Sequence, residues 1–320
     1  MPILNMVQAI NLALKQEMQR DRDVVIVGED VGRDGGVFRV TEGLWELFGD
    51  ERVIDTPLAE SGIVGTAIGM AIYGLRPVAE IQFMGFIYPA IDQIFSHASR
   101  IRARSRGRFT CPIVIRTPYG AGIRAPDHHS ESTEALFCHM PGIKVVVPSS
   151  PYNAKGLLVS AIRDPDPVIF LEPTRLYRLI KEDVPEGEYT IPLGRARVVQ
   201  QGRDVTVITW GSMLQRVIQS IDGFDAEVID LMTLVPLDEE TILNSVKKTG
   251  RVVIVHEAPK TGGFGAEVSA TIAEDAMLYL EAPIIRVTGY DVVMPLPKLE
   301  EYYMPSIDRI RKGIEEVMRY

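Results

Sequence analysis

Short apolar runs alternate with segments of helical periodicity along most of the chain. The first runs lie at residues 24–28, 52–55, 77–83, 112–117, 143–148 and 167–172, and patterns with a helical period lie at 60–73, 87–104 and 152–163. The runs are rich in β-branched residues and lack the alternation with polar residues that marks a half-exposed strand. Strands of this kind joined through helices predict an α/β domain with a mainly parallel sheet covered on both faces.

A polar, turn-rich stretch interrupts this rhythm between residues 179 and 193 and predicts a linker. The rhythm then resumes, with strand-like runs at 205–210, 226–231, 252–257 and 283–288 and helical patterns near 213–221, 238–248, 264–277 and 306–319. We therefore expect two α/β domains, at 1–178 and 194–320, each with a mainly parallel sheet flanked by helices. The second domain is the smaller one.

The composition excludes several classes of function. At 320 residues with 46% hydrophobic residues, the chain is long enough to bury two cores. A formal net charge of −9 argues against a nucleic-acid-binding surface, and no apolar run reaches the roughly 18 residues of a membrane-spanning helix. Because the chain has two cysteines and begins with an amphipathic pattern in place of a targeting segment, we expect a cytoplasmic protein.

One acidic residue, Glu60, stands at the start of an apolar, glycine-rich helical pattern. A carboxylate at the start of a buried helix costs free energy unless a partner takes its charge or its proton. Gly62, Gly65 and Gly69 leave the helix surface almost without side chains, so a second helix or a cofactor can approach closely. The alternative is a core helix whose own first-turn amides are capped by Glu60.

Common nucleotide and hydrolase motifs are absent or out of context. Residues 120–125 match the pattern GxGxxA after a strand, but Pro126 and Asp127 follow in place of the helix that would receive a pyrophosphate. The chain has no GxxxxGK[ST] and no GxSxG, and Ser212 lacks the second glycine of a nucleophile elbow. A Rossmann dehydrogenase, a P-loop enzyme and a serine hydrolase are all disfavoured.

Histidines gather in the stretch that follows. His128, His129 and His139 lie close to Cys138, but their spacing places no pair on one helical face and forms no CxxC, which argues against a structural zinc site. A loop histidine beside Ser130 can instead donate a proton or bind a polar substrate. The alternative is a histidine that is simply exposed.

Several longer motifs occur in the order and spacing of one family. They include GEDVG (28–32), DTPLAESG (55–62), RPVAEIQF (76–83), HSESTEALF (129–137), HEAPKTGGFGAE (256–267) and RVTGYDVVMP (286–295). Over nearly its whole length the chain resembles the beta subunit of the thiamine-diphosphate-dependent decarboxylase component of 2-oxo acid dehydrogenase complexes. The resemblance implies a transketolase-like pyrimidine-binding domain followed by a transketolase C-terminal-like domain.

The resemblance also implies a catalytic site. Glu60 matches the carboxylate that hydrogen-bonds the aminopyrimidine ring of thiamine diphosphate, and His129 matches the histidine near the substrate carboxylate or the acyl group in transfer. Phe86 matches the aromatic residue that stacks on the pyrimidine, and Gln82 matches a polar neighbour of that ring. For Phe86 and Gln82 the alternative is core packing. His128 has no counterpart to which a role can be assigned.

A potassium site is implied by the loop at residues 160–167. The implied ligands are Ile113, Ala161, Ile162, Asp164 and Asp166. Asp166 stands where relatives often carry Asn, and Pro165 lies between the two acids. The alternative is an ordinary Asp-Pro turn without a metal.

A signature for the diphosphate and its Mg²⁺, GDG followed some 30 residues later by Asn-Asn, is absent from the chain. The resemblance therefore implies that an alpha subunit holds Mg²⁺ and the diphosphate, in a heterotetramer of two alpha and two beta chains. The second domain is expected to contact the second beta subunit and the lipoyl-bearing acyltransferase core.

The motif at 256–267 and Gln82 resemble branched-chain members more than pyruvate members, so we expect a branched-chain 2-oxo acid as substrate. The alternatives are a pyruvate or acetoin dehydrogenase, a split transketolase subunit and a scaffold that has lost its chemistry. Glu60 argues against the scaffold.

Overall fold

The strands of the first half pair into one large sheet. The computed structural model describes residues 2–320, and its first-domain strands are β2 (Val24–Gly28), β3 (Val53–Asp55), β4 (Arg76–Glu80), β5 (Val114–Tyr119), β6 (Lys144–Val146) and β7 (Val168–Pro173), joined by β12 (Thr233–Val235). Within this range the order is β12-β6-β7-β5-β4-β2-β3, and all neighbours are parallel except β12 and β6.

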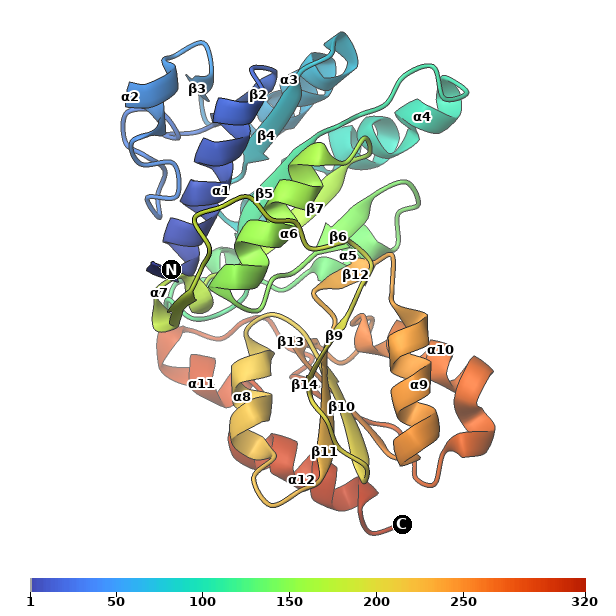
Figure 1. The fold of residues 1–320 in the computed structure, drawn as a ribbon. Helices are drawn as coiled ribbons and strands as arrows, with labels where there is room; N and C mark the ends of the chain where they lie inside the picture. Colours follow the sequence, from blue (N-terminus) through green and yellow to red (C-terminus); the bar gives the residue numbers. More distant parts are fainter. Residues whose placement is uncertain (1) are drawn as a thin grey trace.

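Helices cover both faces of this sheet because successive strand residues point to opposite sides. On one face pack α1 (Met6–Arg20), α2 (Leu44–Phe48), α6 (Pro151–Arg163) and α7 (Leu176–Leu179), against side chains such as Val78 and Val114. On the other face pack α3 (Glu60–Tyr73) and α5 (Glu134–Cys138), against Ala79 and Ile115 (Figure 1). Neither face of the sheet is left open, as the unbroken apolar runs predicted.

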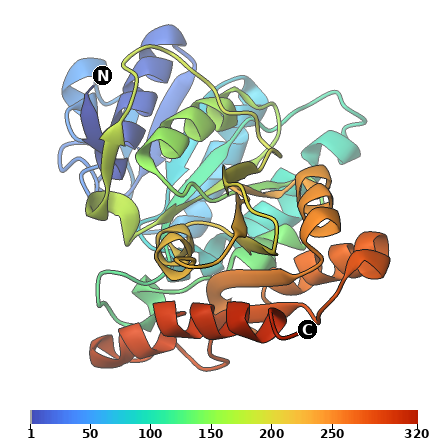
Figure 2. The same ribbon diagram turned by 60° about the horizontal axis from the view of Figure 1, so that its bottom comes forward.

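The second domain is a smaller sheet in the order β14-β13-β10-β11-β9 across the described residues. Its strands are β9 (Arg197–Gln200), β10 (Val205–Thr209), β11 (Ala226–Asp230), β13 (Val252–Pro259) and β14 (Ile285–Gly289), with β9 antiparallel. Its helices are α8 (Met213–Ser220), α9 (Glu239–Thr249), α10 (Gly265–Ala276), α11 (Glu300–Tyr303) and α12 (Ile307–Val317). Figure 2 brings α12 forward, on the side of this domain that faces away from the first.

One of the hydrophobic clusters spans both domains. Buried side chains of the first domain, such as Phe137, belong to the same contiguous cluster as Trp210 and Phe264 of the second. β12 also crosses over, because it follows the second-domain strand β11 but pairs with β6 of the first sheet. The predicted fold class, two mainly parallel sheets flanked by helices, is confirmed, and the domains are fastened to each other through apolar packing.

The predicted linker is bound to the first domain along part of its length. It contains β8 (Lys181–Asp183), which pairs antiparallel with β1 (Ile3–Asn5). Further along, the Ile191 amide donates to the carbonyl of Gly156 at 3.1 Å, and Ser160 Oγ donates to the Ile191 carbonyl at 2.6 Å. The segment is therefore hydrogen-bonded along α6 and is not a free linker.

The predicted helix at 87–104 is correct in position but wrong in regularity. The segment begins with a 3-10 helix at Met84–Ala90, passes through a π turn at Gln93–His97 and ends in α4 (Ile101–Arg104). Pro89 supplies no amide, and Ser99 Oγ donates back to the Phe95 carbonyl at 2.8 Å, which competes with regular α-helical bonding. Among residues 2–320, no helix is long and apolar enough to cross a membrane.

Candidate active site

The predicted site residues follow the carboxyl ends of three parallel strands of the first sheet, β3, β4 and β5. α3 begins at Glu60 shortly after β3, and Gln82 follows β4. Phe86 lies in the 3-10 helix after Gln82, and His129 lies at the end of a loop after β5. Ligands of open parallel sheets bind at this edge, because the loops that leave it are free to carry polar groups.

His129 and Phe86 are brought into contact. The His129 ring lies edge-on to Phe86, with centroids 5.1 Å apart, and to Phe83, with centroids 4.4 Å apart. A Cβ at Gly85 would lie 2.5 Å from the carbonyl oxygen of His128, so the close approach of the two backbones requires glycine. Phe83 was not singled out from the sequence, because it ends an apolar run that predicts only a strand.

The carboxylate of Glu60 is half-buried and makes no hydrogen bond or ion pair with any residue in 2–320. The alternative of a cap made by Glu60 on its own helix is therefore not formed. The first turn of α3 is held in another way, since Ser61 Oγ donates to the Pro89 carbonyl at 2.5 Å. This bond ties the helix that carries Glu60 to the segment that carries Phe86.

Gln82 also presents an open polar group. Its side chain is half-buried, and its amide has no hydrogen-bond partner among the described residues. The imidazole Nδ1 of His129 is buried and likewise has no partner within residues 2–320. Buried polar groups are normally paired, so open groups at one sheet edge are typical of a binding site.

Glu29 is a further acidic residue at this edge, directly after β2, and sequence reasoning missed it. Burial raises the pKa of the Glu29 carboxyl, and the nearby charges of Asp30 and Glu60 raise it further. A carboxyl whose pKa is raised by burial and by neighbouring acids favours a ligand that donates hydrogen bonds or carries positive charge.

One face of α3 is open in this chain. Ile63, Val64 and Ala67 are buried against the sheet, as expected, but the opposite face is exposed. A Cβ at Gly69 would meet no atom within 4 Å, and Tyr73 is 92% exposed. The expectation of a buried helix is therefore correct for one face only, and the glycine-rich face is free to receive a partner.

The carboxylates of the predicted potassium site are already paired with cations. Lys144 Nζ lies 2.7 Å from Asp164 Oδ1, and Arg102 Nε lies 2.6 Å from Asp166 Oδ1. Pro165 and its neighbours form a closed turn, since the Asp166 amide donates to Asp164 Oδ1 at 2.9 Å.

The predicted main-chain ligands of potassium have donors as well. The Ile162 carbonyl accepts a bond from Arg76 Nη1 at 2.8 Å, the Ala161 carbonyl accepts one from the Asp164 amide at 3.2 Å, and the Ile113 carbonyl accepts one from the Val168 amide at 3.0 Å. Two protein cations pair with the two carboxylates, and Arg76 donates to one of the main-chain oxygens, so an added monovalent cation does not fit this arrangement. The potassium site stays a prediction that the geometry does not favour.

A buried ion cluster fixes the strand ends beneath the site. Arg116 of β5 donates to both oxygens of Glu172 at 2.7 Å each and to Glu80 of β4. Tyr177 Oη donates to Glu172 at 2.5 Å. Burial lowers the pKa of Arg116, but the two carboxylates outweigh it and hold the pKa above its usual value. The guanidinium therefore stays charged and locks neighbouring strands together.

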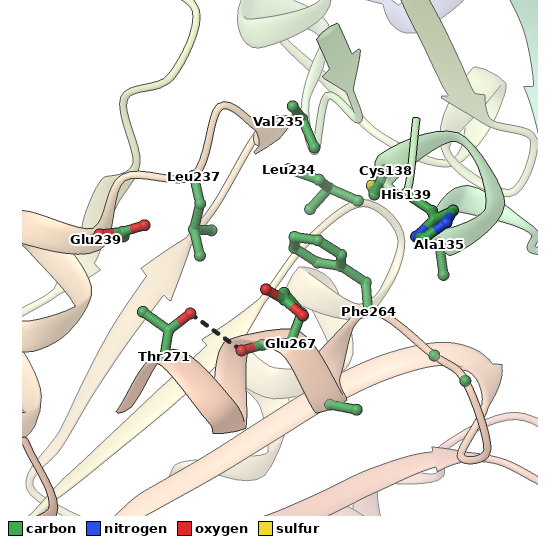
Figure 3. Close-up of a pocket in the computed structure, with 13 residues that line it drawn as sticks. Ala135, Cys138, His139, Leu234, Val235, Leu237, Glu239, Phe264, Glu267 and Thr271 are labelled. Carbon is green, nitrogen blue, oxygen red and sulfur yellow. Dashed lines mark hydrogen bonds between the residues drawn. The ribbon is translucent and has the colours of Figure 1, made fainter. Parts of the chain in front are cut away.

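A cavity of about 520 Å³ lies apart from these residues, between the domains. Phe264 and Leu234 form its apolar wall, and Cys138 and His139 of the first domain face Glu267 of α10 across it (Figure 3). None of the predicted site residues lines it. The predicted site and this cavity are therefore separate features of the chain.

Each half of the chain matches a known family of protein domains. Residues 3–180 match "Transketolase, pyrimidine binding domain", and residues 194–310 match "Transketolase, C-terminal domain". A solved structure described as "Split gene transketolase, inactive beta4 tetramer" superposes with a TM-score of 0.81 over 99% of this chain and 98% of its own, at 21% identity. That identity shows the fold alone. The two family matches place this chain in the class of two-domain proteins of transketolase type.

Full-length relatives narrow this class. The pyruvate dehydrogenase E1 component subunit beta of Acholeplasma laidlawii is 52% identical over 324 residues, covering 100% of this chain and 99% of the relative. The 2-oxoisovalerate dehydrogenase subunit beta of Bacillus subtilis (strain 168) is 49% identical over 327 residues, covering 100% of both. The chain therefore belongs to the family of E1 beta subunits of 2-oxo acid dehydrogenases, as its motifs predicted.

Proposed function

We propose that this chain supplies the pyrimidine half of a thiamine diphosphate site in a 2-oxo acid dehydrogenase. The observation that carries the proposal is the unpaired carboxylate of Glu60, at a sheet edge where Gln82 also has an open polar group and where Phe86 and His129 meet. An aminopyrimidine ring fits this set, because it offers hydrogen-bond donors and acceptors at its rim and an apolar face for an aromatic side chain.

Each residue has a role that follows from its chemistry. Glu60 would hold or share a proton at the pyrimidine ring nitrogen, Gln82 would bond the ring rim, and Phe86 would fix the ring plane. His129 would lie near the substrate carboxylate or the acyl group in transfer and act there as a proton donor, since a histidine exchanges protons near neutral pH. Thiamine diphosphate, when bound, supplies a nucleophilic carbon and an electron sink for loss of carbon dioxide.

A separate alpha subunit would complete the site by holding Mg²⁺ and the diphosphate. The chain has no GDG signature with a later Asn-Asn, and the glycine-rich face of α3 beside Glu60 is open for a partner helix. We propose a heterotetramer of two alpha and two beta chains with a cofactor at each alpha–beta contact. Potassium is left out of the proposal, because its predicted ligands already have donors.

The second domain would contact the second beta subunit and the lipoyl-bearing acyltransferase core. Its last third exposes apolar side chains that are available for such contacts, including Val293, Leu296 and Tyr302, each more than 70% exposed. With two cysteines in 320 residues, a reducing compartment such as the cytoplasm suits this assembly.

A branched-chain 2-oxo acid is the substrate we favour, on the grounds of Gln82 and the motif at 256–267. Pyruvate is equally compatible with the relatives, whose names divide between pyruvate and 2-oxoisovalerate. A split transketolase receives less support. The split-gene transketolase structure is 21% identical to this chain, whereas the pyruvate dehydrogenase subunit beta of Acholeplasma laidlawii is 52% identical to it.

The test is decarboxylation by the chain alone and co-purified with its alpha partner, with thiamine diphosphate, Mg²⁺ and an artificial electron acceptor. Pyruvate, 2-oxobutyrate, 3-methyl-2-oxobutanoate and 4-methyl-2-oxopentanoate would be compared. We expect turnover only with the alpha partner and highest kcat/KM for the branched acids. Full turnover by this chain alone would overturn the half-site, and a preference for pyruvate would overturn the substrate while keeping the mechanism.

A further inference from the structure

We propose that Glu257 of the second domain is a positioning residue for His129, because it clamps together the two ends of the loop that carries this histidine. The inference rests on the proposed function, in which His129 acts on the substrate. Glu257 lies in β13 of the second domain, in the run VVIVHE, and nothing in the local sequence links it to the first-domain loop.

Both ends of the loop bond to the same oxygen of Glu257. The Ala121 amide donates to Glu257 Oε1 at 2.7 Å, and Ser132 Oγ donates to the same atom at 2.9 Å. The loop base is also closed internally, since the Gly120 amide donates to the Glu131 carbonyl at 2.9 Å. A Cβ at Gly120 would collide with Glu257, so the approach of the carboxylate to the loop requires glycine.

The carboxylate itself is held rigidly. Glu257 is 2% exposed, and Ser212 Oγ at the start of α8 donates to its other oxygen. Burial raises the pKa of Glu257, and the bonds from Ser212, Ala121 and Ser132 act against this rise. Glu257 is buried on β13, a strand that is paired with β10 and β14, so its position is set by the sheet of the second domain and the loop must follow it.

A second acid of the same domain holds the middle of the loop. Glu300 is buried at the start of α11, and its Oε2 accepts a bond from the Arg124 amide at 3.0 Å. The second domain therefore accepts hydrogen bonds from the first-domain loop both near its ends and in its middle.

His129 depends on these bonds to its loop because its buried ring nitrogen Nδ1 has no hydrogen bond among the described residues to hold it. Its side chain is located by edge contacts with Phe83 and Phe86. The position of the imidazole is thus set by these two apolar contacts and by the path of its own backbone. Since misplacing a catalytic group by about 1 Å costs on the order of 100-fold in rate, loosening the clamp should be visible in turnover.

Two serines provide a matched pair of variants. Ser132→Ala removes a bond from the loop to Glu257, whereas Ser212→Ala removes a bond to the same carboxylate from outside the loop. Each would be made in the reconstituted alpha–beta enzyme, alone and combined with His129→Ala. We expect Ser132→Ala to lower kcat about tenfold with KM for 3-methyl-2-oxobutanoate and pyruvate unchanged within about twofold, and Ser212→Ala to change kcat by less than about twofold.

The combination with His129→Ala separates positioning from a structural role. If Ser132 acts through His129, its effect on kcat disappears once the imidazole is gone, whereas a structural effect stays additive. Hydrogen exchange of residues 120–132 gives a readout without catalysis, and we expect faster exchange in Ser132→Ala only. Glu257→Gln, which keeps an oxygen for Ala121 and Ser132, should retain more kcat than Glu257→Ala.

These variants distinguish a failure of the proposed role of His129 from a failure of the positioning role of Glu257. If His129→Ala is as active as the wild type, the proposed role of the histidine fails and the inference falls with it. If His129→Ala loses activity but Ser132→Ala and Ser212→Ala have equal effects, or the effect of Ser132→Ala persists in the His129→Ala background, the function stands and the positioning role is refuted.

Discussion

Glu134 lies at the contact between the domains and should make the stability of this chain fall as pH rises. Its side chain is fully buried at the start of α5, and one oxygen accepts a bond from Trp210 Nε1 of the second domain at 3.2 Å. The other oxygen is buried without a partner within residues 2–320. Burial raises the pKa of Glu134 to about 7, and the charge of Glu257 adds to the rise against the bonds from Trp210 and Tyr119.

The sign and size of the effect follow from proton linkage. The carboxyl has a pKa of 4.5 when unfolded and about 7 when folded, so between these values the folded state binds more protons. Its contribution is complete below pH 4.5, is lost as pH rises towards 7, and stays absent above that. At about 1.36 kcal/mol per unit of pKa difference, the loss is about 3 kcal/mol.

The perturbation is Glu134→Gln, which cannot ionise and keeps an oxygen for Trp210. Urea unfolding at pH 5, 6, 7 and 8, followed by tryptophan fluorescence at constant ionic strength, gives the free energy of unfolding at each pH. Because part of the loss occurs below pH 5, we expect the wild type to lose about 2.5 kcal/mol more than the variant between pH 5 and pH 8. Glu274→Gln, an exposed change on α10, should leave the pH dependence unchanged. Parallel curves for Glu134→Gln and the wild type would refute the reasoning.

Three further outcomes are expected. Arg116→Met should lower the free energy of unfolding by about 3 to 5 kcal/mol, because Glu80 and Glu172 would lose their buried counter-charge; a loss below about 1 kcal/mol in urea unfolding would contradict this. Gly69→Leu should change the chain's own free energy of unfolding by less than about 1 kcal/mol, because a Cβ there meets nothing within 4 Å. Calorimetry should nevertheless show at least about tenfold weaker association with the alpha subunit. Unchanged affinity would mean that the open face of α3 is not an interface. Replacing potassium by sodium should leave the Tm unchanged, because Asp164 is already paired with a lysine; a potassium-specific rise in Tm would restore the predicted metal site.

The sequence predicted those elements whose signal is local. A strand buried on both faces must be an unbroken apolar run, and the run at 24–28 coincides with β2. The helix at 60–73 coincides with α3, because glycine and small apolar residues continue up to the αL residue Gly74 that ends it. By contrast, β12 is three residues long and owes its place to pairing with β6 of the other domain, which its own sequence does not encode.

The residues of the candidate site likewise divide into those with a local signal in the sequence and those without one. Glu60 could be singled out because a carboxylate is conspicuous in an apolar segment, whereas Glu29 follows a strand where acids are ordinary. Glu257 bonds to residues 136 and 125 positions away, so its contacts exist only once both domains have folded. The glycines of α3 predicted a surface that a second helix or a cofactor can approach, but the extent of its exposure is a property of the assembled fold.

The most direct test of the proposed half-site is Glu60→Gln in the reconstituted alpha–beta enzyme, measured as both thiamine diphosphate affinity and decarboxylation rate. Because in the proposed site the carboxylate would act on a proton of the pyrimidine ring, we expect the rate to fall at least about 100-fold while the cofactor still binds. Glu46→Gln, an exposed change on α2, should match the wild type. A Glu60→Gln enzyme with a rate within about twofold of the wild type would contradict the proposed site.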